Sequence, residues 1–143
     1  MKAIDFEKHC NEVIEHCKET LFSKADEYAS NEDRLANFKQ PTSLFKTNPA
    51  KICLMYDTKH IASMVKIAED VDKGILPSRE LLLEKVGDYI NYGLLFYANM
   101  LEIVDSDLDK KLNDNVGFAI RDIDGKEETI TSDEFVEILN GLD

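Results

Sequence analysis

Hydrophobic positions that recur every three or four residues divide most of the chain into amphipathic helices. The first is expected from Asp5 to Tyr28, the second from about Pro49 to Val71, and the third from Ser78 to about Val104. Asn48-Pro49 is a typical helix start because proline suits the first helical position, and Ser78 is a suitable cap. The pattern therefore predicts three long helices.

Each long helix carries an apolar stripe that we expect to face a common core. The stripes comprise Phe6, Cys10, Val13, Ile14, Cys17, Leu21, Ala25 and Tyr28; then Leu54, Ile61, Met64, Val65 and Ala68; then Leu83, Val86, Ile90, Leu94, Tyr97 and Leu101. Three more apolar residues of the third helix, Tyr89, Phe96 and Met100, widen its apolar arc beyond the needs of one layer. That excess favours a homo-oligomer.

Shorter elements complete the expected fold. A short helix is predicted over Glu32 to Phe38, and the alternation in "VGFAIRDIDGKEETITSDEF" predicts a β-hairpin that turns at Asp124-Gly125. Ser132 or Asp133 would then cap a last helix over Glu134 to Leu139. The expected class is mainly α: a bundle of three long helices plus a short one over residues 1–111, with a hairpin and short helix over 112–143 packed on the same domain.

The wording "DIDG…DEF" is similar to a calcium-binding EF-hand loop, but its spacing fails. With Gly125 as the central glycine, the twelfth position falls on Thr131, where that loop needs a glutamate. We therefore do not expect calcium binding there.

Several polar residues interrupt the apolar stripes. Asp57 projects into the middle of the expected core face, with His60 at i+3. A carboxylate facing a core is costly unless it is paired or hydrogen-bonded, so Asp57 needs a partner. Lys24 at the edge of the first stripe, Arg34 or a metal could supply one. The alternatives are a purely structural ion pair and a Lys24 that reaches solvent along the helix.

The third helix adds a polar edge and two glycines. Glu84, Asp88 and Asn91 follow each other at i, i+4 and i+7, which suits either a binding edge or an ordinary solvated face. Gly87 and Gly93 each cost roughly 1 kcal/mol of helix stability relative to alanine. Such glycines can admit a neighbouring backbone or a ligand.

Together these residue types are those of a nucleoside phosphate site. Carboxylates one helical turn apart can hold Mg²⁺, and lysine and arginine suit phosphates. The expected roles are catalysis by Glu84, Asp88 and Asp57; magnesium binding by Glu27, Glu84 and Asp88; phosphate contacts by Lys24, Arg34 and Lys59; hydrogen bonds to sugar or base by Asn37 and Asn91; and further substrate contacts by Tyr28, on the base, and by His60.

Three segments, "KADEYASNEDRLANFK", "DTKHIASMVKI" and "EKVGDYINYGLLFYANML", resemble in that order a small all-α family of phage and prophage proteins. That family is labelled a nucleotide-modification-associated domain. The resemblance spans about Phe22 to Glu102 and rests on Lys24, Glu27-Tyr28, Arg34-Leu35-Ala36-Asn37-Phe38, Lys59-His60 and Glu84-Lys85-Val86-Gly87-Asp88-Tyr89-Ile90-Asn91-Tyr92. It implies a link to nucleotide or DNA modification in the cytoplasm of a bacterial host, without specifying a reaction.

A weaker similarity is to MazG-like nucleoside triphosphate pyrophosphohydrolases, which are all-α and depend on magnesium. "EKVGD" is similar to their "EELGD" segment, with Asp88 on its aspartate. Two features depart from that family. Lys85 stands where a second acid belongs, and the ExxE of Glu12 to Glu15 lies far upstream, away from the apolar stripe.

Composition narrows the choice of partners. The 143 residues include 29 acidic and 17 basic ones, a net charge of −12, which disfavours non-specific nucleic-acid binding. The charge also supports another function, that of an acidic phage interaction protein that inhibits a host factor by occupying its basic, nucleic-acid-binding surface. A non-catalytic subunit is a third alternative.

Two further expectations concern the compartment. The N-terminus lacks a signal-peptide core and no run of 18 apolar residues occurs, so we expect a cytoplasmic protein without a membrane span. We expect the three cysteines, Cys10, Cys17 and Cys53, to be reduced thiols, with Cys10 and Cys17 on the first apolar stripe.

Overall fold

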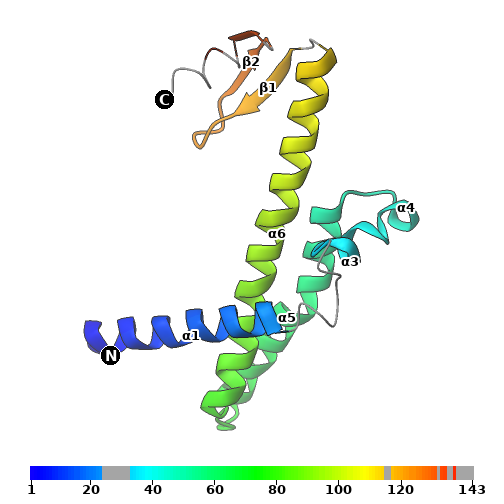
Figure 1. Cartoon of the computed structure of the whole chain (residues 1–143). Coiled ribbons are helices and arrows are strands. Elements are labelled where there is room, and N and C mark those ends of the chain that lie inside the picture. The colour runs from blue at the N-terminus through cyan, green and yellow to red at the C-terminus, as the bar shows by residue number, and fades with distance from the viewer. Residues whose placement is uncertain (24–32, 115–116, 132, 135–136, 138–143) are drawn as a thin grey trace. The chain divides into compact units, whose positions relative to one another are not determined.

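The computed structural model describes residues 1–23, 33–114, 117–131, 133–134 and 137. The chain is mainly helical and carries a two-stranded antiparallel hairpin in its C-terminal part, as the sequence predicts (Figure 1). It divides into two compact units, residues 1–100 and 101–143. Within the described ranges, no helix is long and apolar enough to cross a membrane.

The long helices are α1 (Ala3–Ser23), α5 (Pro49–Asp72) and α6 (Arg79–Asp114). The predicted helix starts are confirmed. Asn48 caps α5, because its side chain accepts a hydrogen bond of 2.9 Å from the Lys51 backbone N–H. Ser78 caps α6 in the same way, accepting from the Leu81 N–H at 3.1 Å.

The end of α6 was predicted too early. The helix continues to Asp114 rather than ending near Val104. Residues 105–114 contain only two apolar residues, Leu108 and Leu112, so the apolar periodicity that continues from Val104 is weak there. Pairs one turn apart still favour helix, such as Asp107 and Lys111, whose charged atoms lie 2.7 Å apart.

Two short helices, α3 (Ala36–Lys39) and α4 (Thr42–Phe45), replace the single one predicted over Glu32 to Phe38. Asp33 explains why α3 starts late: its carboxylate accepts from the Leu35 backbone N–H and from Lys39 Nζ, both at 3.0 Å. The acid thereby closes a turn before the helix. The predicted end of the first helix, at Tyr28, lies outside the described residues.

Few apolar side chains are buried in the described part of the helical unit. They are Cys17, Leu35, Phe38, Ala50, Ile52 and Cys53. Phe38 of α3 lies against Tyr56 of α5 and Tyr92 of α6, with ring centroids 6.1 and 6.3 Å apart. Tyr92, Leu95, Phe96 and Ala98 of α6 pack on this cluster, so α3, α5 and α6 meet there.

The predicted core stripes are only partly buried. In α5, Leu54, Ile61 and Val65 are 49%, 45% and 53% exposed, whereas their neighbours Ile52 and Cys53 are buried. The expected core face of α5 was therefore wrong for the single chain. Apolar residues occupy more than one side of α5, and within the chain α3 and α6 cover the side that carries Ile52 and Cys53. The stripes of α1 and α6 likewise leave residues exposed, namely Phe6, Ile14, Leu94, Tyr97 and Leu101.

α1 contacts α6 closely at a glycine. The thiol of Cys17 donates to the Gly87 carbonyl oxygen at 3.6 Å. A Cβ atom on Gly87 would lie 2.8 Å from Cδ2 of His16, so only glycine fits without a shift. This confirms that Gly87 admits a neighbouring element. Arg79 forms a second link between these helices by pairing with Glu12.

In the C-terminal unit, strand β1 (Phe118–Arg121) pairs antiparallel with β2 (Glu127–Ile130), with Ala119 opposite Thr129. The predicted turn is confirmed. Asp122 accepts hydrogen bonds from the backbone N–H groups of Asp124 and Lys126, at 3.0 and 2.8 Å, so this EF-hand-like acid caps its own turn.

The last predicted helix lies mostly outside the described residues, but its start is visible. Thr131 and Glu134 exchange hydrogen bonds in the pattern of a capping box: Glu134 accepts from the Thr131 N–H at 2.8 Å, and the Glu134 N–H donates back to the Thr131 hydroxyl at 3.3 Å. The cap is therefore Thr131 rather than Ser132 or Asp133.

The contact at Gly87 can be tested with a matched pair of variants. Gly87→Ala should be less stable than Gly93→Ala by roughly 1 kcal/mol or more, because His16 has to move away from the new methyl group. Around Gly93 no atom lies within 4 Å of the Cβ position, so that variant should gain helix stability of about 0.5–1 kcal/mol. Urea denaturation followed by circular dichroism measures both. Adding His16→Ala to Gly87→Ala should remove most of the difference, and equal stability of the two glycine variants would contradict the assignment.

Candidate functional site

The antiparallel packing of α5 on α6 gathers polar side chains from the two helices around one tyrosine. Asp57, Lys59 and His60 come from α5, and Asp88 and Tyr92 come from α6. We call these five residues the α5–α6 cluster. Four of them were expected from the sequence to share a site.

Asp88 and Tyr92 fix the position of the His60 ring. Nδ1 of His60 lies 3.3 Å from Oδ2 of Asp88, and the ring centroids of His60 and Tyr92 are 4.7 Å apart. Burial lowers the pKa of His60 below its ordinary value of 6.5, although the Asp88 carboxylate opposes this. The imidazole is therefore neutral at neutral pH, and Asp88 favours the tautomer with the proton on Nδ1, so that Nε2 keeps a lone pair.

Asp57 is buried one helical turn before His60. Only 7% of the residue is exposed, and within the described ranges its Oδ1 atom is enclosed without a hydrogen bond. Burial raises the pKa of Asp57, and the neighbouring His60 acts in the opposite direction. The prediction that this carboxylate faces the interior is confirmed.

The enclosed polar atoms that lack a partner among the described residues are all assigned as acceptors. They are Asp57 Oδ1, His60 Nε2, and the amide oxygens of Asn37, Asn91 and Asn99. A buried acceptor without a donor costs free energy, so such atoms are uncommon in a protein interior. Two of them, on Asp57 and His60, belong to the α5–α6 cluster, and a molecule that offers hydrogen-bond donors would satisfy them.

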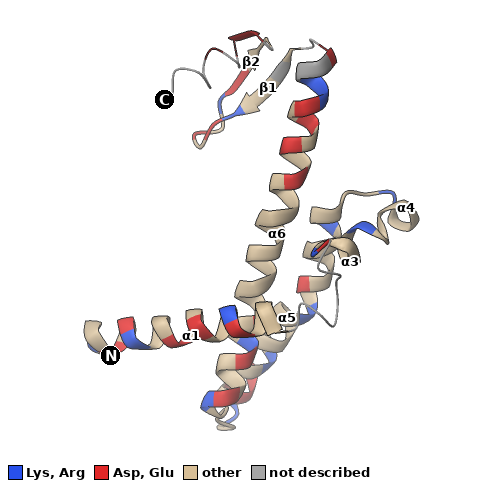
Figure 2. Cartoon of the chain, in the orientation of Figure 1, with Lys and Arg blue, Asp and Glu red and all other residues tan. Residues whose placement is uncertain are grey.

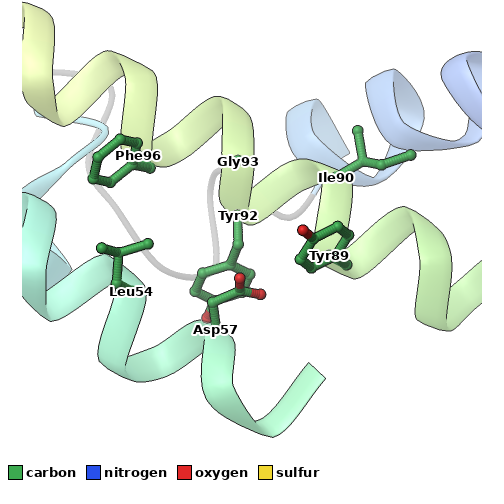
Figure 3. A pocket seen from close by; sticks show the side chains of 7 residues that line it. All are labelled: Leu54, Asp57, Tyr89, Ile90, Tyr92, Gly93 and Phe96. Atoms are coloured by element: carbon green, nitrogen blue, oxygen red, sulfur yellow. The ribbon is translucent and has the colours of Figure 1, made fainter. Parts of the chain in front are cut away.

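A pocket of about 210 Å³ opens beside Asp57. Figure 3 shows Leu54 and Phe96 at one end, Tyr89 at the other, and Asp57 with Tyr92 between them. Ile90 and Gly93 complete the lining. The walls are thus aromatic and aliphatic with a single acid. Drug-sized ligands occupy roughly 300–1,000 Å³, so this pocket suits one ring rather than a whole nucleotide.

Cationic side chains lie at the edge of the cluster. Nζ of Lys59 is 5.9 Å from the centroid of the Tyr92 ring, and Lys59 is otherwise exposed. Lys85, one turn before Asp88, pairs with Glu84 at 2.7 Å. Both cations lie near enough to His60 to lower its pKa.

The remaining expected site residues lie elsewhere or outside the described residues. Glu84 is exposed and pairs with Lys85, Arg34 is exposed in the turn before α3, and Asn37 lies on α3. Asn91 is only 6% exposed, so the solvated-face alternative is wrong for it. Three expected residues, Lys24, Glu27 and Tyr28, lie outside the described residues, and the pairing of Lys24 with Asp57 therefore stays a prediction.

The expected magnesium site also stays a prediction. Among the residues described, no three His, Cys, Asp or Glu side chains converge in a way that could hold a metal ion. Asp88 lies against His60, and Glu84 pairs with Lys85. By themselves these side chains do not form a ready-made metal site, and magnesium binding stays a prediction.

Sequence reasoning missed the central role of Tyr92. This residue contacts His60, Lys59 and Phe38 and lines the pocket. Burial raises the pKa of its hydroxyl. Its position four residues after Asp88, on the same side of α6, was the available signal.

No protein-family model, curated protein or solved structure matches this chain. Its resemblance to the phage nucleotide-modification-associated domain, and the weaker one to MazG-like enzymes, therefore stay predictions. What the chain does has to be inferred from the residues themselves.

Asp57→Asn should raise the free energy of unfolding at neutral pH by roughly 1 kcal/mol, because the amide has nearly the same shape and carries no buried charge. Burial raises the pKa of Asp57, so the folded wild-type protein binds this proton more readily than the unfolded chain and gains stability as the pH falls from that raised value towards 3.8. The advantage of the variant should shrink over the same interval.

Thermal unfolding at several pH values measures this difference. Asp70→Asn is the control, because it makes the same charge change near the exposed end of α5, where Asp70 pairs with Lys66. A variant at Asp57 that is less stable than the wild type at neutral pH would contradict the expectation and indicate a cationic partner for this carboxylate.

The pairing of His60 with Asp88 can be tested through the pKa of His60. His60 should titrate below 6.5, and Asp88→Asn should lower its pKa further, because the Asp88 carboxylate stabilises the imidazolium. Nuclear magnetic resonance of the imidazole protons measures both values. His9 of α1, whose ring contacts Glu12 and Arg79 rather than Asp88, is the internal control. An unchanged pKa of His60 in the variant would refute the pairing.

Proposed function

We propose that this chain binds a nucleotide at the α5–α6 cluster and takes part in nucleotide processing. One observation carries the proposal: two enclosed acceptors, Asp57 Oδ1 and His60 Nε2, occur in a cluster that borders an aromatic-lined pocket. The resemblance to a phage nucleotide-modification-associated domain points in the same direction.

A nucleobase would supply the hydrogen-bond donors and the flat ring that this pocket can accommodate. Its edges carry N–H donors, which the carboxylate of Asp57 can accept, and its faces stack on rings such as Tyr89 and Phe96. The volume of about 210 Å³ suits the base alone. The sugar and phosphates would then lie outside the pocket.

The charge distribution is compatible with phosphates near α5 and α6. Residues 101–143 contain 13 acidic and 4 basic residues, whereas residues 1–100 contain 16 and 13. Three quarters of the net charge therefore belongs to the C-terminal unit, and Figure 2 shows acids along the later turns of α6. The helical unit, at −3, does not repel an anion strongly. Lys59 and Lys85 are the cations that we expect to contact phosphates.

Magnesium remains part of the proposal in a limited sense. Mg²⁺ is commonly held by one or two carboxylates together with the phosphates of a substrate. A magnesium–nucleotide complex does not require the three-ligand group that the described residues lack. His60 does not line the pocket and its Nε2 is enclosed, so we assign it a positioning role beside Asp88 and no proton transfer to a substrate.

A panel of canonical and modified nucleoside and deoxynucleoside triphosphates, each with Mg²⁺ or Mn²⁺, tests the proposal. Thermal shift and pyrophosphate release are read on the same samples. At least one nucleotide should raise the melting temperature of the full chain. Asp57→Asn should weaken its binding by about tenfold or more, although the free variant is the more stable protein.

Weaker nucleotide binding by a variant that is more stable would show that Asp57 acts in binding rather than in maintaining the fold. Asp70→Asn should bind nucleotide like the wild type, because Asp70 lies away from the pocket on the same helix. The proposal is wrong if no nucleotide produces either a shift or turnover.

A second function is favoured by the acidic C-terminal unit. Its net charge of −9 within 43 residues suits an interaction protein that occupies a basic surface of a host factor. Under that function the helical unit needs no small ligand, and the nucleotide panel gives no thermal shift. The enclosed acceptors beside the pocket make nucleotide binding the better supported of the two.

A further inference from the structure

One face of the α5–α6 hairpin repeats its apolar residues with the spacing of a helical bundle. Steps of three and four alternate without interruption along both helices. In α5 they connect Leu54, Asp57, Ile61, Met64, Ala68 and Val71; in α6 they connect Leu82, Val86, Tyr89, Gly93, Phe96 and Met100. We call these twelve residues the seam. Heptad spacing of this kind is the signature of helices that pack side by side in coiled coils and four-helix bundles.

The seam is only half covered within the chain. Leu54 and Ile61 in α5, and Leu82 and Tyr89 in α6, each leave about two fifths to one half of their surface exposed. Figure 3 shows the middle of this face, with Leu54 of α5 opposite Phe96 of α6. If two helices were removed from a four-helix bundle, the core residues of the remaining pair would be exposed to a similar extent.

The small core of the helical unit shows that this face needs a cover. Among the described residues of 1–100, only six apolar side chains are buried, whereas twenty large apolar side chains are exposed. A unit of this size normally buries most of its apolar surface in one core. Five large apolar residues of the seam, Leu54, Ile61, Val71, Leu82 and Tyr89, are between 41% and 49% exposed, so the seam still carries apolar surface that a partner can bury. A standard interface buries roughly 800 Å² on each partner.

We propose that the seam is covered by the seam of a second copy of this chain. A two-fold axis through the seam would place one helix pair on another and form a four-helix bundle, which is a closed arrangement. The seam holds eleven uncharged residues and one acid, so it has no charge pattern that would select a charged partner. It also extends over five turns of both helices, as a contact between matching hairpins requires.

The second copy would complete the candidate site. The pocket lies in the middle of the seam, because five of its seven lining residues, Leu54, Asp57, Tyr89, Gly93 and Phe96, are seam residues. Asp57 is the single charged position among the twelve. A lone polar residue in such a seam can set the register and the number of chains, at a cost in stability. The second copy would therefore supply a further wall of the pocket next to Asp57.

This proposal does not rest on nucleotide binding, and the wild-type protein tests it directly. Light scattering coupled to size-exclusion chromatography should give twice the chain mass of 16.3 kDa without any nucleotide. The melting temperature should rise with protein concentration, because dissociation accompanies unfolding in a dimer of this type. A monomer with a concentration-independent melting temperature would overturn the proposal, and would mean that another part of the chain or a different protein covers the seam.

A pair of matched variants locates the interface. Ile61→Glu places a charge in the middle of the seam and should weaken dimerisation by roughly 100-fold or more. Leu44→Glu makes a comparable substitution on α4, away from the seam, at a residue that is 78% exposed, and should remain dimeric. Dimerisation of Ile61→Glu at wild-type strength would refute the seam as the interface. If Ile61→Glu does not fold, the concentration dependence of the wild type still decides the question.

The two proposals fail separately. A dimer that gives no shift with any nucleotide would overturn only the proposed function. A wild-type protein that is monomeric but binds a nucleotide would overturn only the proposed dimer.

Discussion

The packing of α5 on α6 around Phe38 is the contact on which the helical unit depends. Phe38, Ile52 and Cys53 are almost completely buried, and Tyr92 presents its ring to this group from α6. The thiol of Cys53 donates to the Tyr92 carbonyl oxygen at 3.5 Å, so the two backbones approach closely at this level. The following turns of α5 then place Asp57 beside the pocket and His60 against Asp88. The positions of the polar cluster and of the pocket therefore both follow from this small apolar contact.

Much of the fold was predictable because helix starts have strong local signals. The caps at Asn48 and Ser78, the Asp124-Gly125 turn and the close approach at Gly87 all follow from the chemistry of a few adjacent residues. The core stripe of α5 was wrong because periodicity identifies an apolar face without identifying what covers it. In this chain the face with Leu54 and Ile61 is the exposed one.

The candidate site was predictable only in part. The burial of Asp57 was predicted, although the stripe used to predict it, with Leu54 and Ile61, is the exposed one; its proximity to His60 follows from helical spacing. The contact of His60 with Asp88 depends on how α5 and α6 are paired, which no single helix encodes. Tyr92 was missed because an aromatic residue on a helix usually signals packing. Here its ring packs on Phe38 and His60 alike, so one residue connects the apolar cluster with the polar one.

The reactivity of the two buried thiols can report local opening of the helical unit. Cys17 is enclosed where α1 meets Gly87, and Cys53 where α5 meets Tyr92. Burial raises the pKa of both thiols, that of Cys53 to about 11, so neither forms much reactive thiolate while it remains enclosed. An alkylating reagent would therefore modify each one mainly after its own helix contact has separated. The two rates would report independently how often α1 leaves α6 and how often the α5–α6 hairpin opens, without any introduced label.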